Sequence, residues 1–300
     1  MEFNKKLDED INNLINKLTG FEKMYHMMRI VDPKRKRVLD IKKNRLDTMD
    51  SYCYKFWEQD RICENCISMR AYNENNTFFK MEYTNSNIYM VTAIPVEVGG
   101  QTIVIELLNN VTDSMLIGDG NYENNRVVNS LIKNINEIAV TDSLTSVYGR
   151  RYINEKLPAE LIISSVKEKP LSIILIDLDN FKDINDSLGH LAGDAVLKDI
   201  AEILKGCIRS KDDWAARYGG DEFIICLPNT DNKTAKQIAE RVRSSIENKE
   251  FKYNGKAINI TASFGVCTNT EDNFTTIEQF IESADKKLYS SKRHGKNKVL

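Results

Sequence analysis

The feature that most constrains this chain is a pair of adjacent glycines, Gly219 and Gly220, between strand-like runs at 214–218 and 222–227. Adjacent glycines between two such runs favour a hairpin with a tight turn. Because neither glycine has a Cβ, the backbone of this turn can approach a ligand closely. Two acids, Asp221 and Glu222, follow at the mouth of the turn. Taken alone, the pattern also fits an ordinary hairpin with solvated acids.

A second acidic site favours a functional interpretation. Residues 173–176 form a continuous apolar run that is typical of a buried strand, and Asp177 and Asp179 follow it directly. Carboxylates at the end of a buried strand are costly unless they are paired or hold a cation. If this strand neighbours the hairpin, Asp177 and Asp221 converge, and such oxygen ligands suit Mg²⁺ together with substrate phosphates. Helix capping is the alternative role for the two acids after the strand.

The length of 300 residues fits two domains. Changes between strand-like and helix-like residue patterns along the chain predict where these domains lie. We expect a first domain at 1–112, a connecting helix at 113–140 and a second domain at 141–300. The first domain should begin with a helix, since Phe3, Leu7, Ile11, Leu14 and Leu18 recur at helical spacing before Gly20.

The rest of the first domain predicts an antiparallel sheet with helices across one face. Strands are expected at 24–31, 38–41, 77–83, 88–96 and 101–108, and short helices at 52–57 and 66–72. This order resembles a PAS-type sensor domain, and the resemblance rests on topology and length. A ligand for this domain is expected, but the sequence does not identify it.

The connecting segment carries an apolar stripe, Val128, Leu131, Ile135 and Ile138, at heptad-like spacings of three, four and three. Two interpretations stay open: a helix packed on its own domain, or a parallel dimer stalk. After Thr141, strand and helix patterns alternate, which predicts an α/β domain of about 160 residues.

The overall charge excludes some functions. A formal net charge of −2 argues against a large nucleic-acid surface, and the basic run 34–37 is interpreted as a solvated hairpin. The apolar runs are far shorter than the ~18 residues of a membrane helix, and the N-terminus lacks the apolar core of a signal peptide. A cytoplasmic chain without membrane contact, with its six cysteines reduced or binding a metal, is therefore expected.

The second domain contains a series of short motifs in a fixed order, through which it resembles the GGDEF domain of diguanylate cyclases. These motifs are 142–145 with Arg150 and Arg151, 177–182, Asn185-Asp186, Gly189-His190, Gly193-Asp194, 219–223, Ala284-Asp285, Leu288-Tyr289, Lys292 and 295–297.

The resemblance implies a central mixed sheet flanked by helices, a fold shared with nucleotide cyclases and polymerase palms. It implies a homodimeric enzyme that joins two GTP molecules into cyclic di-GMP and releases two pyrophosphates. The alternative is a catalytically inactive domain that binds GTP or cyclic di-GMP. A mononucleotide cyclase would use a metal ion held by carboxylates in the same way, but it does not need the 219–223 hairpin.

The resemblance also implies roles for individual residues. Mg²⁺ (or Mn²⁺) would be held by Asp177, Asp221 and the Leu178 carbonyl, and Asp221 or Glu222 would accept the proton of the attacking hydroxyl. Lys182 would stabilise the transition state. The implied GTP-binding residues are Asn185, Asp194 and His190 around the guanine, Asn180, Phe181, Lys182, Lys292 and Lys296 around the triphosphate, and Gly219 and Gly220 in the turn.

Two departures from the family pattern bear on function. Lys296 replaces the usual arginine, which keeps the charge but loses the bidentate fork. Ser210 occupies the position of an arginine that binds the product in many relatives, and Arg209 is shifted from it by one residue. We therefore expect the product-inhibition site to be absent.

Three cysteines of the first domain lie close together in the sequence: Cys53, Cys63 and Cys66. A Cys-x-x-Cys pair with a third cysteine can hold a metal or serve as a redox centre, with His26, another chain or a non-protein ligand completing a metal site. Three reduced thiols in a small core are the alternative.

Overall fold

The computed structural model describes residues 25–42, 45–58, 61–84, 87–98, 100–112, 125–209, 212–270, 274 and 276–300. The helix predicted before Gly20 lies outside this range. Internal contacts divide the chain into two compact units, Met1–Ala139 and Val140–Leu300. Each unit is described by itself.

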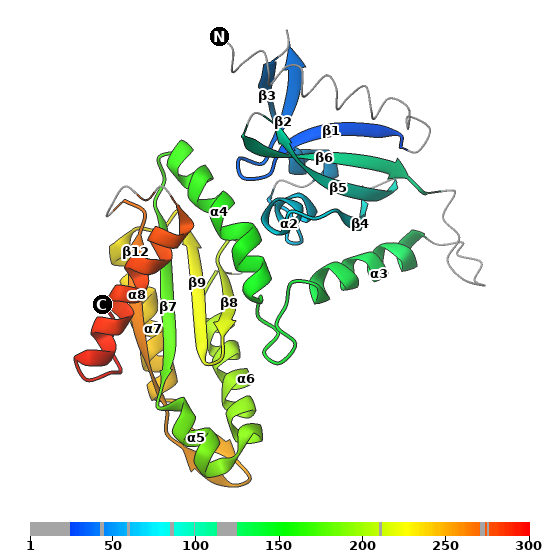
Figure 1. Cartoon of the computed structure of the whole chain (residues 1–300). Helices are drawn as coiled ribbons and strands as arrows, with labels where there is room; N and C mark the ends of the chain where they lie inside the picture. The colour runs from blue at the N-terminus through cyan, green and yellow to red at the C-terminus, as the bar shows by residue number, and fades with distance from the viewer. Residues whose placement is uncertain are drawn as a thin grey trace. The chain divides into compact units, whose positions relative to one another are not determined.

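The first unit is built on one antiparallel sheet with the strand order β3-β2-β1-β6-β5-β4 (Figure 1). Its strands are β1 Met27–Asp32, β2 Arg37–Lys42, β3 Arg45–Tyr52, β4 Phe78–Tyr83, β5 Ile88–Val98 and β6 Gln101–Asn110. Strand β3 was not predicted, because its sequence is largely polar and lacks the apolar alternation that marks a half-buried strand.

Two short helical segments follow β3: the 3-10 helix η2, Cys53–Trp57, and helix α2, Ile67–Glu74. Apolar side chains of both segments pack with those of β5 and β6 in one buried cluster that includes Trp57, Ala71, Val91 and Leu108. The helices thus close one part of the sheet, as the sequence predicts. No helix among the described residues is both long enough and apolar enough to span a bilayer.

Helix α3, Asn125–Ile138, ends the first unit. Ile132 is buried against Ile88 of β5, whereas Ile135 and Ile138 are 64% and 74% exposed. The side chains of Val128 and Leu131 lie outside the described residues. One face of α3 therefore packs on its own unit, and another face presents exposed isoleucines.

The described residues of the second unit form a four-stranded sheet, ordered β12-β7-β9-β8, with a small hairpin and five helices. The elements are α4 Arg150–Val166, β7 Leu171–Asp179, α5 Phe181–Leu188, α6 His190–Gly206, β8 Trp214–Gly219, β9 Glu222–Pro228, α7 Asn232–Glu247, β10 Phe251–Tyr253, β11 Lys256–Ile258, β12 Thr261–Thr268 and α8 Ile277–Arg293.

Two features of this unit differ from the sequence predictions. The strand pairs are antiparallel, and parallel pairing is limited to the isolated bridges Tyr148–Ala216 and Phe264–Val299, so the predicted mixed sheet is wrong for the named strands. Helix α4 was not predicted, since it contains Pro158 and its buried residues lie on several sides rather than along one stripe.

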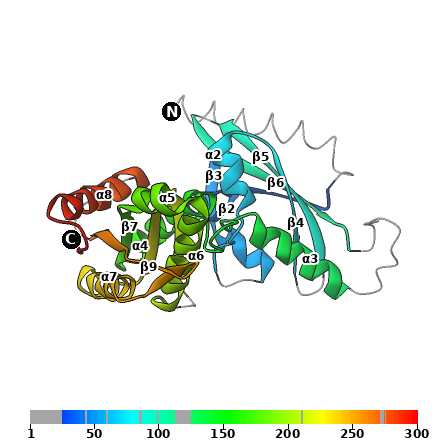
Figure 2. The same ribbon diagram turned by 90° about the horizontal axis from the view of Figure 1, so that it is seen from below.

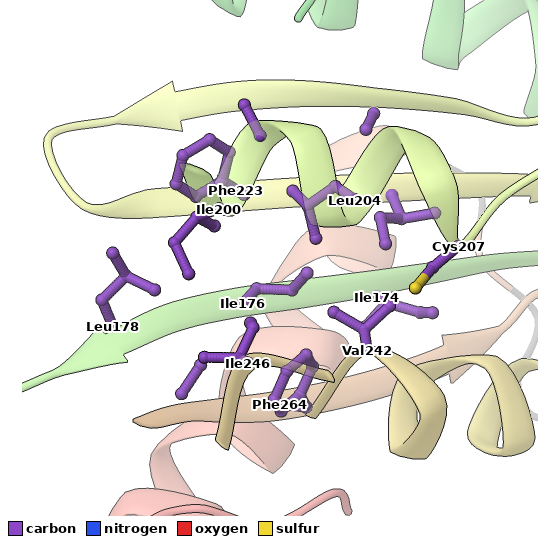
Figure 3. Packing of buried hydrophobic residues seen from close by; sticks show 14 of the residues in the cluster. Ile174, Ile176, Leu178, Ile200, Leu204, Cys207, Phe223, Val242, Ile246 and Phe264 are labelled. Atoms are coloured by element: carbon purple, nitrogen blue, oxygen red, sulfur yellow. The ribbon is translucent and has the colours of Figure 1, made fainter. Parts of the chain in front are cut away.

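Strand β7 separates two cores. All nine of its residues are buried, and successive side chains alternate between the faces of the sheet. Ile174, Ile176 and Leu178 pack with α6 and α7, as Figure 3 shows. Leu171, Ile173 and Leu175 pack with α4 and α8 on the opposite face. In Figure 2 the strand lies between α8 and α7.

Candidate active site

The acidic end of β7 lies beside the glycine hairpin. Asp177 is 9% exposed and stands opposite Glu222 in the β7–β9 register. The backbone amide of Leu178 donates to the carbonyl oxygen of Asp221 at 3.4 Å. The structure therefore brings together the two acidic sites that the sequence singled out.

Lys292 of α8 reaches the same point: its Nζ lies 2.6 Å from Oδ2 of Asp177. Desolvation is the largest influence on the pKa of Asp177 and raises it, Lys292 opposes the rise, and Asp221 and Asp179 add to it. The pKa of Glu222 is also raised, first by desolvation and then by Asp177. This concentration of negative charge is only partly balanced by one ammonium group.

A divalent cation fits this donor set. Asp177 and Asp221 supply carboxylate oxygens, the ligand type that Mg²⁺ prefers, and their mutual repulsion would be relieved by the ion. Two carboxylates with substrate oxygens suffice for Mg²⁺. A complete protein-only site is not formed: no group of three or more His, Cys, Asp or Glu able to hold a metal occurs in the part of the chain that is described.

A pocket of about 370 Å³ lies between α5, α6 and the hairpin. It gathers the implied guanine-site residues from both helices and connects them to the acids. Its lining consists of Phe181, Lys182, Asn185, His190, Asp194, Leu197, Arg217, Gly220 and Asp221. The lining provides hydrogen-bond donors and acceptors beside a carboxylate that follows the hairpin turn. This is the composition expected of a small-molecule site.

Gly193 of α6 makes room for Asn185 in this pocket. A Cβ at position 193 would lie 2.1 Å from Oδ1 of Asn185 and 3.0 Å from Cζ of Phe181. The glycine therefore leaves the space that the Asn185 amide occupies.

The segment between β7 and α5 is held by its neighbours. Asp179 is buried and accepts hydrogen bonds from Oγ1 of Thr261, Oγ of Ser263 and the backbone amide of Asn297. Nζ of Lys296 donates to Oδ1 of Asn180 at 2.5 Å. These bonds place the C-terminal loop with Lys296 next to the N-terminus of α5, where backbone amides favour an anion.

A second pocket, of about 450 Å³, opens on the other side of the hairpin strand between α4 and α8. Glu222, Tyr218, Arg150 and Asp285 are among its lining residues. Asp221 and Glu222 are adjacent in sequence, yet Asp221 lines the first pocket and Glu222 the second.

Arg217 is a contributor that sequence reasoning did not assign. Its guanidinium donates to the Gly220 carbonyl at 2.7 and 2.9 Å and pairs with Asp142 at 3.3 Å. The backbone of Tyr148 exchanges hydrogen bonds with the backbone of β8. The segment before α4 is thereby tied to the hairpin. The available signal in the sequence was the position of Arg217, two residues before Gly219.

The cysteines of the first unit do not form the predicted metal centre. Cys53, Cys63 and Cys66 form no disulfide, and they do not make up a metal-holding group of three such residues in the described part of the chain. Desolvation raises the pKa of Cys63 to about 12 and that of Cys53 as well. Nδ1 of His26 instead accepts a hydrogen bond from the backbone amide of Asn110 and lies 2.6 Å from Oδ1 of Asn109. The raised pKa values make Cys53 and Cys63 poor metal ligands, because the thiolate is the binding form.

Comparison with known proteins identifies the second unit. Residues 139–298 match the family model described as Diguanylate cyclase, GGDEF domain. Diguanylate cyclase A of Treponema denticola is 45% identical over 166 residues, which cover 54% of this chain and 44% of that protein. Diguanylate cyclase DosC of Escherichia coli is 37% identical over 160 residues, covering 53% of this chain and 34% of that protein. The match thus spans less than half of either relative.

Solved structures are also similar to this chain. The coiled coil and GGDEF domain of DgcB from Caulobacter crescentus, in complex with c-di-GMP, superposes with a TM-score of 0.54 at 25% identity, covering 58% of this chain and 91% of that one. Diguanylate cyclase SiaD from Pseudomonas aeruginosa gives a TM-score of 0.53 at 32% identity, covering 58% and 66%. Since the family match extends over more than half of the sequence, the chain belongs to the GGDEF, or diguanylate cyclase, domain family.

Proposed function

We propose that the protein is a diguanylate cyclase that condenses two GTP molecules into cyclic di-GMP and two pyrophosphates. One observation carries the proposal: the buried strand-end Asp177 and the hairpin acids lie beside a pocket that collects Asn185, Asp194 and Lys182. The names of the relatives add support. An inactive binding module would not need this cluster of partly buried, mutually repelling carboxylates.

In the proposed complex, GTP occupies the pocket between α5 and α6. The amide of Asn185 and the carboxylate of Asp194 hydrogen-bond the guanine edge, with His190 nearby. Backbone amides at 180–182, Lys292 and Lys296 hold the triphosphate, and Lys182 stabilises charge on the reacting phosphate. Gly219 and Gly220 allow the hairpin backbone to lie against the nucleotide.

Asp177, Asp221 and the Leu178 carbonyl would hold Mg²⁺ or Mn²⁺ near the α-phosphate. When bound, the ion neutralises phosphate charge and lowers the pKa of a coordinated hydroxyl. Lys292 already balances part of the charge on Asp177 and orients that carboxylate through its 2.6 Å contact.

Of the two candidate bases, we assign proton acceptance to Glu222. Desolvation and the neighbouring Asp177 raise its pKa, which brings the carboxylate closer to the basicity that general-base catalysis requires. Its side chain faces the second pocket rather than the one proposed for the bound GTP. A ribose hydroxyl arriving from outside the first pocket would therefore meet Glu222.

Within the described residues, each chain offers one pocket with this set of side chains, so synthesis of a two-nucleotide product requires two chains with their sites facing each other. A homodimer is accordingly part of the proposed mechanism. The decisive experiment is incubation of the purified protein with GTP and Mg²⁺, followed by mass spectrometry of the products. Cyclic di-GMP supports the proposal, and unreacted GTP contradicts it in favour of a binding module.

Gly193→Ala should weaken GTP binding. The added methyl group would overlap Oδ1 of Asn185 and force that side chain out of its position. We expect KM for GTP to rise by about tenfold or more. A tenfold rise corresponds to a loss of roughly 1.4 kcal/mol of binding free energy. Gly206→Ala, in the same helix, is the control, because a Cβ there has no atom within 4 Å. Equal KM values for the two variants would contradict the role given to Asn185.

Product inhibition should be weak. Arg209 is the nearest arginine to the family's inhibitory position, and its guanidinium is already engaged by Asp213, the Pro228 carbonyl and Thr230. Ser210 itself lies outside the described residues. Addition of cyclic di-GMP to a steady-state assay should leave the maximal rate largely unchanged, in the wild type and in Arg209→Ala alike. Noncompetitive inhibition that disappears in Arg209→Ala would refute this expectation.

We further propose that the first unit is a PAS-like sensor domain that regulates synthesis. Its β2-β1-β6-β5-β4 portion is an antiparallel sheet in which the first strand pairs with both the second and the last, with α2 packed on it. Helix α3 would transmit the signal as a dimer stalk, and its exposed Ile135 and Ile138 are suited to pack against a second copy. The sensed ligand is not identified by these residues.

If α3 is such a stalk, its rotational phase should control turnover. One residue inserted near Asn134 rotates the downstream helix by about 100°. Seven inserted residues nearly restore the original face. Turnover should collapse or lose its response to the signal with one inserted residue and largely recover with seven. Indistinguishable rates for the two insertions would identify α3 as a passive tether.

A further inference from the structure

The loop that carries Lys296 has an unusual backbone. Gly295, Lys296 and Asn297 have φ angles of 105°, 60° and 49°, so three successive residues lie in the left-handed region. Glycine enters this region without strain and asparagine tolerates it, but lysine seldom adopts it. A strained backbone of this kind persists only where the surrounding structure holds it. The position of Lys296 therefore depends on the contacts that its loop makes.

Asn297 anchors this loop through both its backbone and its side chain. Its backbone amide donates to Oδ2 of Asp179 at 3.1 Å. Its side-chain Nδ2 donates to Oε1 of Glu247 at 2.7 Å, and its Oδ1 accepts from Nη1 of Arg243 at 2.9 Å. A guanidinium can only donate and a carboxylate can only accept, so this pair fixes the orientation of the Asn297 amide. Both side-chain contacts come from helix α7.

Helix α7 is a rigid base for these two contacts. Val242 and Ile246 direct the buried face of the helix into the core beside β7 (Figure 3). Arg243 and Glu247 follow them by one residue each and pair with one another at 2.7 Å. The side chain of Arg243 is 15% exposed, and its hydrogen bonds to Glu240 and Glu247 raise its pKa, so it keeps its charge. Two charged side chains of a fixed helix therefore hold the loop.

The loop in turn sets where the ammonium group of Lys296 lies. Nζ of Lys296 donates to Oδ1 of Asn180, the N-cap residue of α5. Backbone amides at that end of the helix favour an anion, and the proposed triphosphate site includes them. Lysine binds phosphate as a point charge on a flexible stem, without the fork of an arginine. Its contribution therefore depends on the backbone from which the stem leaves.

We propose that Arg243 and Glu247 are positioning residues for the triphosphate of GTP: through Asn297 they hold the 295–297 backbone so that Lys296 reaches the phosphates. This role rests on the proposed function, since it requires GTP in the pocket between α5 and α6. Neither α7 residue is among those that line this pocket, so each acts through the loop. An ion pair on a helix that carries none of the family's motifs thereby determines how well the phosphates are held.

Titration calorimetry in the presence of Mg²⁺ with two non-reacting nucleotides tests this role. 3′-Deoxy-GTP lacks the attacking hydroxyl, GMP lacks the two outer phosphates, and both carry the guanine. Arg243→Met should raise the Kd of 3′-deoxy-GTP by about tenfold, the order of effect of displacing one charge-assisted contact. The Kd of GMP should stay unchanged, because the guanine site is untouched. Lys205→Met, which breaks an exposed ion pair with Glu202 on α6, is the matched control and should leave both values unchanged.

A double variant shows whether Arg243 acts through Asn297. Asn297→Gly removes both side-chain contacts with α7 but permits the left-handed backbone, and it should also weaken 3′-deoxy-GTP binding about tenfold. Adding Arg243→Met to Asn297→Gly should cause no further loss, whereas independent effects would multiply. Glu247→Gln keeps an oxygen that accepts from Asn297 and should weaken binding far less than Glu247→Ala.

The outcomes separate this role from the proposed function. Multiplied losses in the double variant, equal losses for both nucleotides, or a wild-type Kd in Arg243→Met would overturn the role of α7 while GTP binding itself stands. If the wild type binds neither nucleotide, the proposed function fails and the positioning role fails with it. If Arg243→Met does not fold, Glu247→Ala takes its place in the same double-variant comparison.

Discussion

Replacing Asp221 with asparagine is expected to reduce cyclic di-GMP synthesis by a factor of at least about 10² to 10³, the range for loss of one preorganised electrostatic group. Asp177→Asn should have an effect of the same order. Both residues are proposed to hold the ion that neutralises the reacting phosphate, and an amide brings no charge to that task. The measurement is initial rate of product formation at saturating GTP and Mg²⁺.

The Asp221 variant should lose activity without losing stability. Asp221 is one of the charges that raise the pKa of Asp177 and of Glu222, so its carboxylate repels both neighbours in the folded protein. Removing that charge at neutral pH should leave Tm unchanged or slightly higher. Asp199→Asn, which breaks an exposed ion pair with Lys249, is the matched carboxylate control and should retain full activity. Near-wild-type turnover in Asp221→Asn would contradict the metal assignment.

Gly265→Ala is expected to destabilise the second unit severely. Gly265 lies in β12 where α8 crosses, and an added Cβ would stand 2.1 Å from the Ala284 carbonyl oxygen and 2.4 Å from the Leu288 amide nitrogen. Both are backbone atoms of a helix, so neither can rotate away. Overpacking of this kind costs about 3 kcal/mol or more. For a unit of this size, that corresponds to a Tm roughly 10 °C lower.

Thermal unfolding followed by circular dichroism measures this effect. Gly206→Ala is the control, since a Cβ at that helical position meets no atom within 4 Å, and replacement of glycine by alanine in a helix is neutral or stabilising. If both alanine variants unfold at the wild-type temperature, β12 and α8 do not approach as closely as the structure indicates.

Sequence analysis located best the elements whose buried residues follow one another directly in the chain. Strand β7 is buried on both faces, so its apolar run is visible without any knowledge of its neighbours. The glycine hairpin is equally local, because the turn itself places Gly220 at a positive φ of 51°, which favours glycine. Each of these signals lies within a few residues.

Features that depend on distant partners were not predictable in this way. Lys292 meets Asp177 across 115 positions of sequence, and the room that Gly193 leaves for Asn185 exists only once α5 and α6 are packed. Lys36 sits in a run of basic residues that favours solvent, and only the tertiary structure gives its ammonium a sulfur partner. Local patterns therefore located the acids but not the cations that accompany them.

The attachment of Tyr148 and Asp142 to strand β8 also has a mechanical consequence. The backbone of Tyr148 is bonded to Ala215 and Arg217, and Arg217 grips both Asp142 and the Gly220 carbonyl. A pull on the chain at Val140 therefore reaches the hairpin through the Asp142–Arg217 ion pair and two backbone hydrogen bonds, and it also acts on the buried apolar cluster that Val140 shares with residues of α4. Tension on this segment would therefore act on the turn between β8 and β9, next to Asp221.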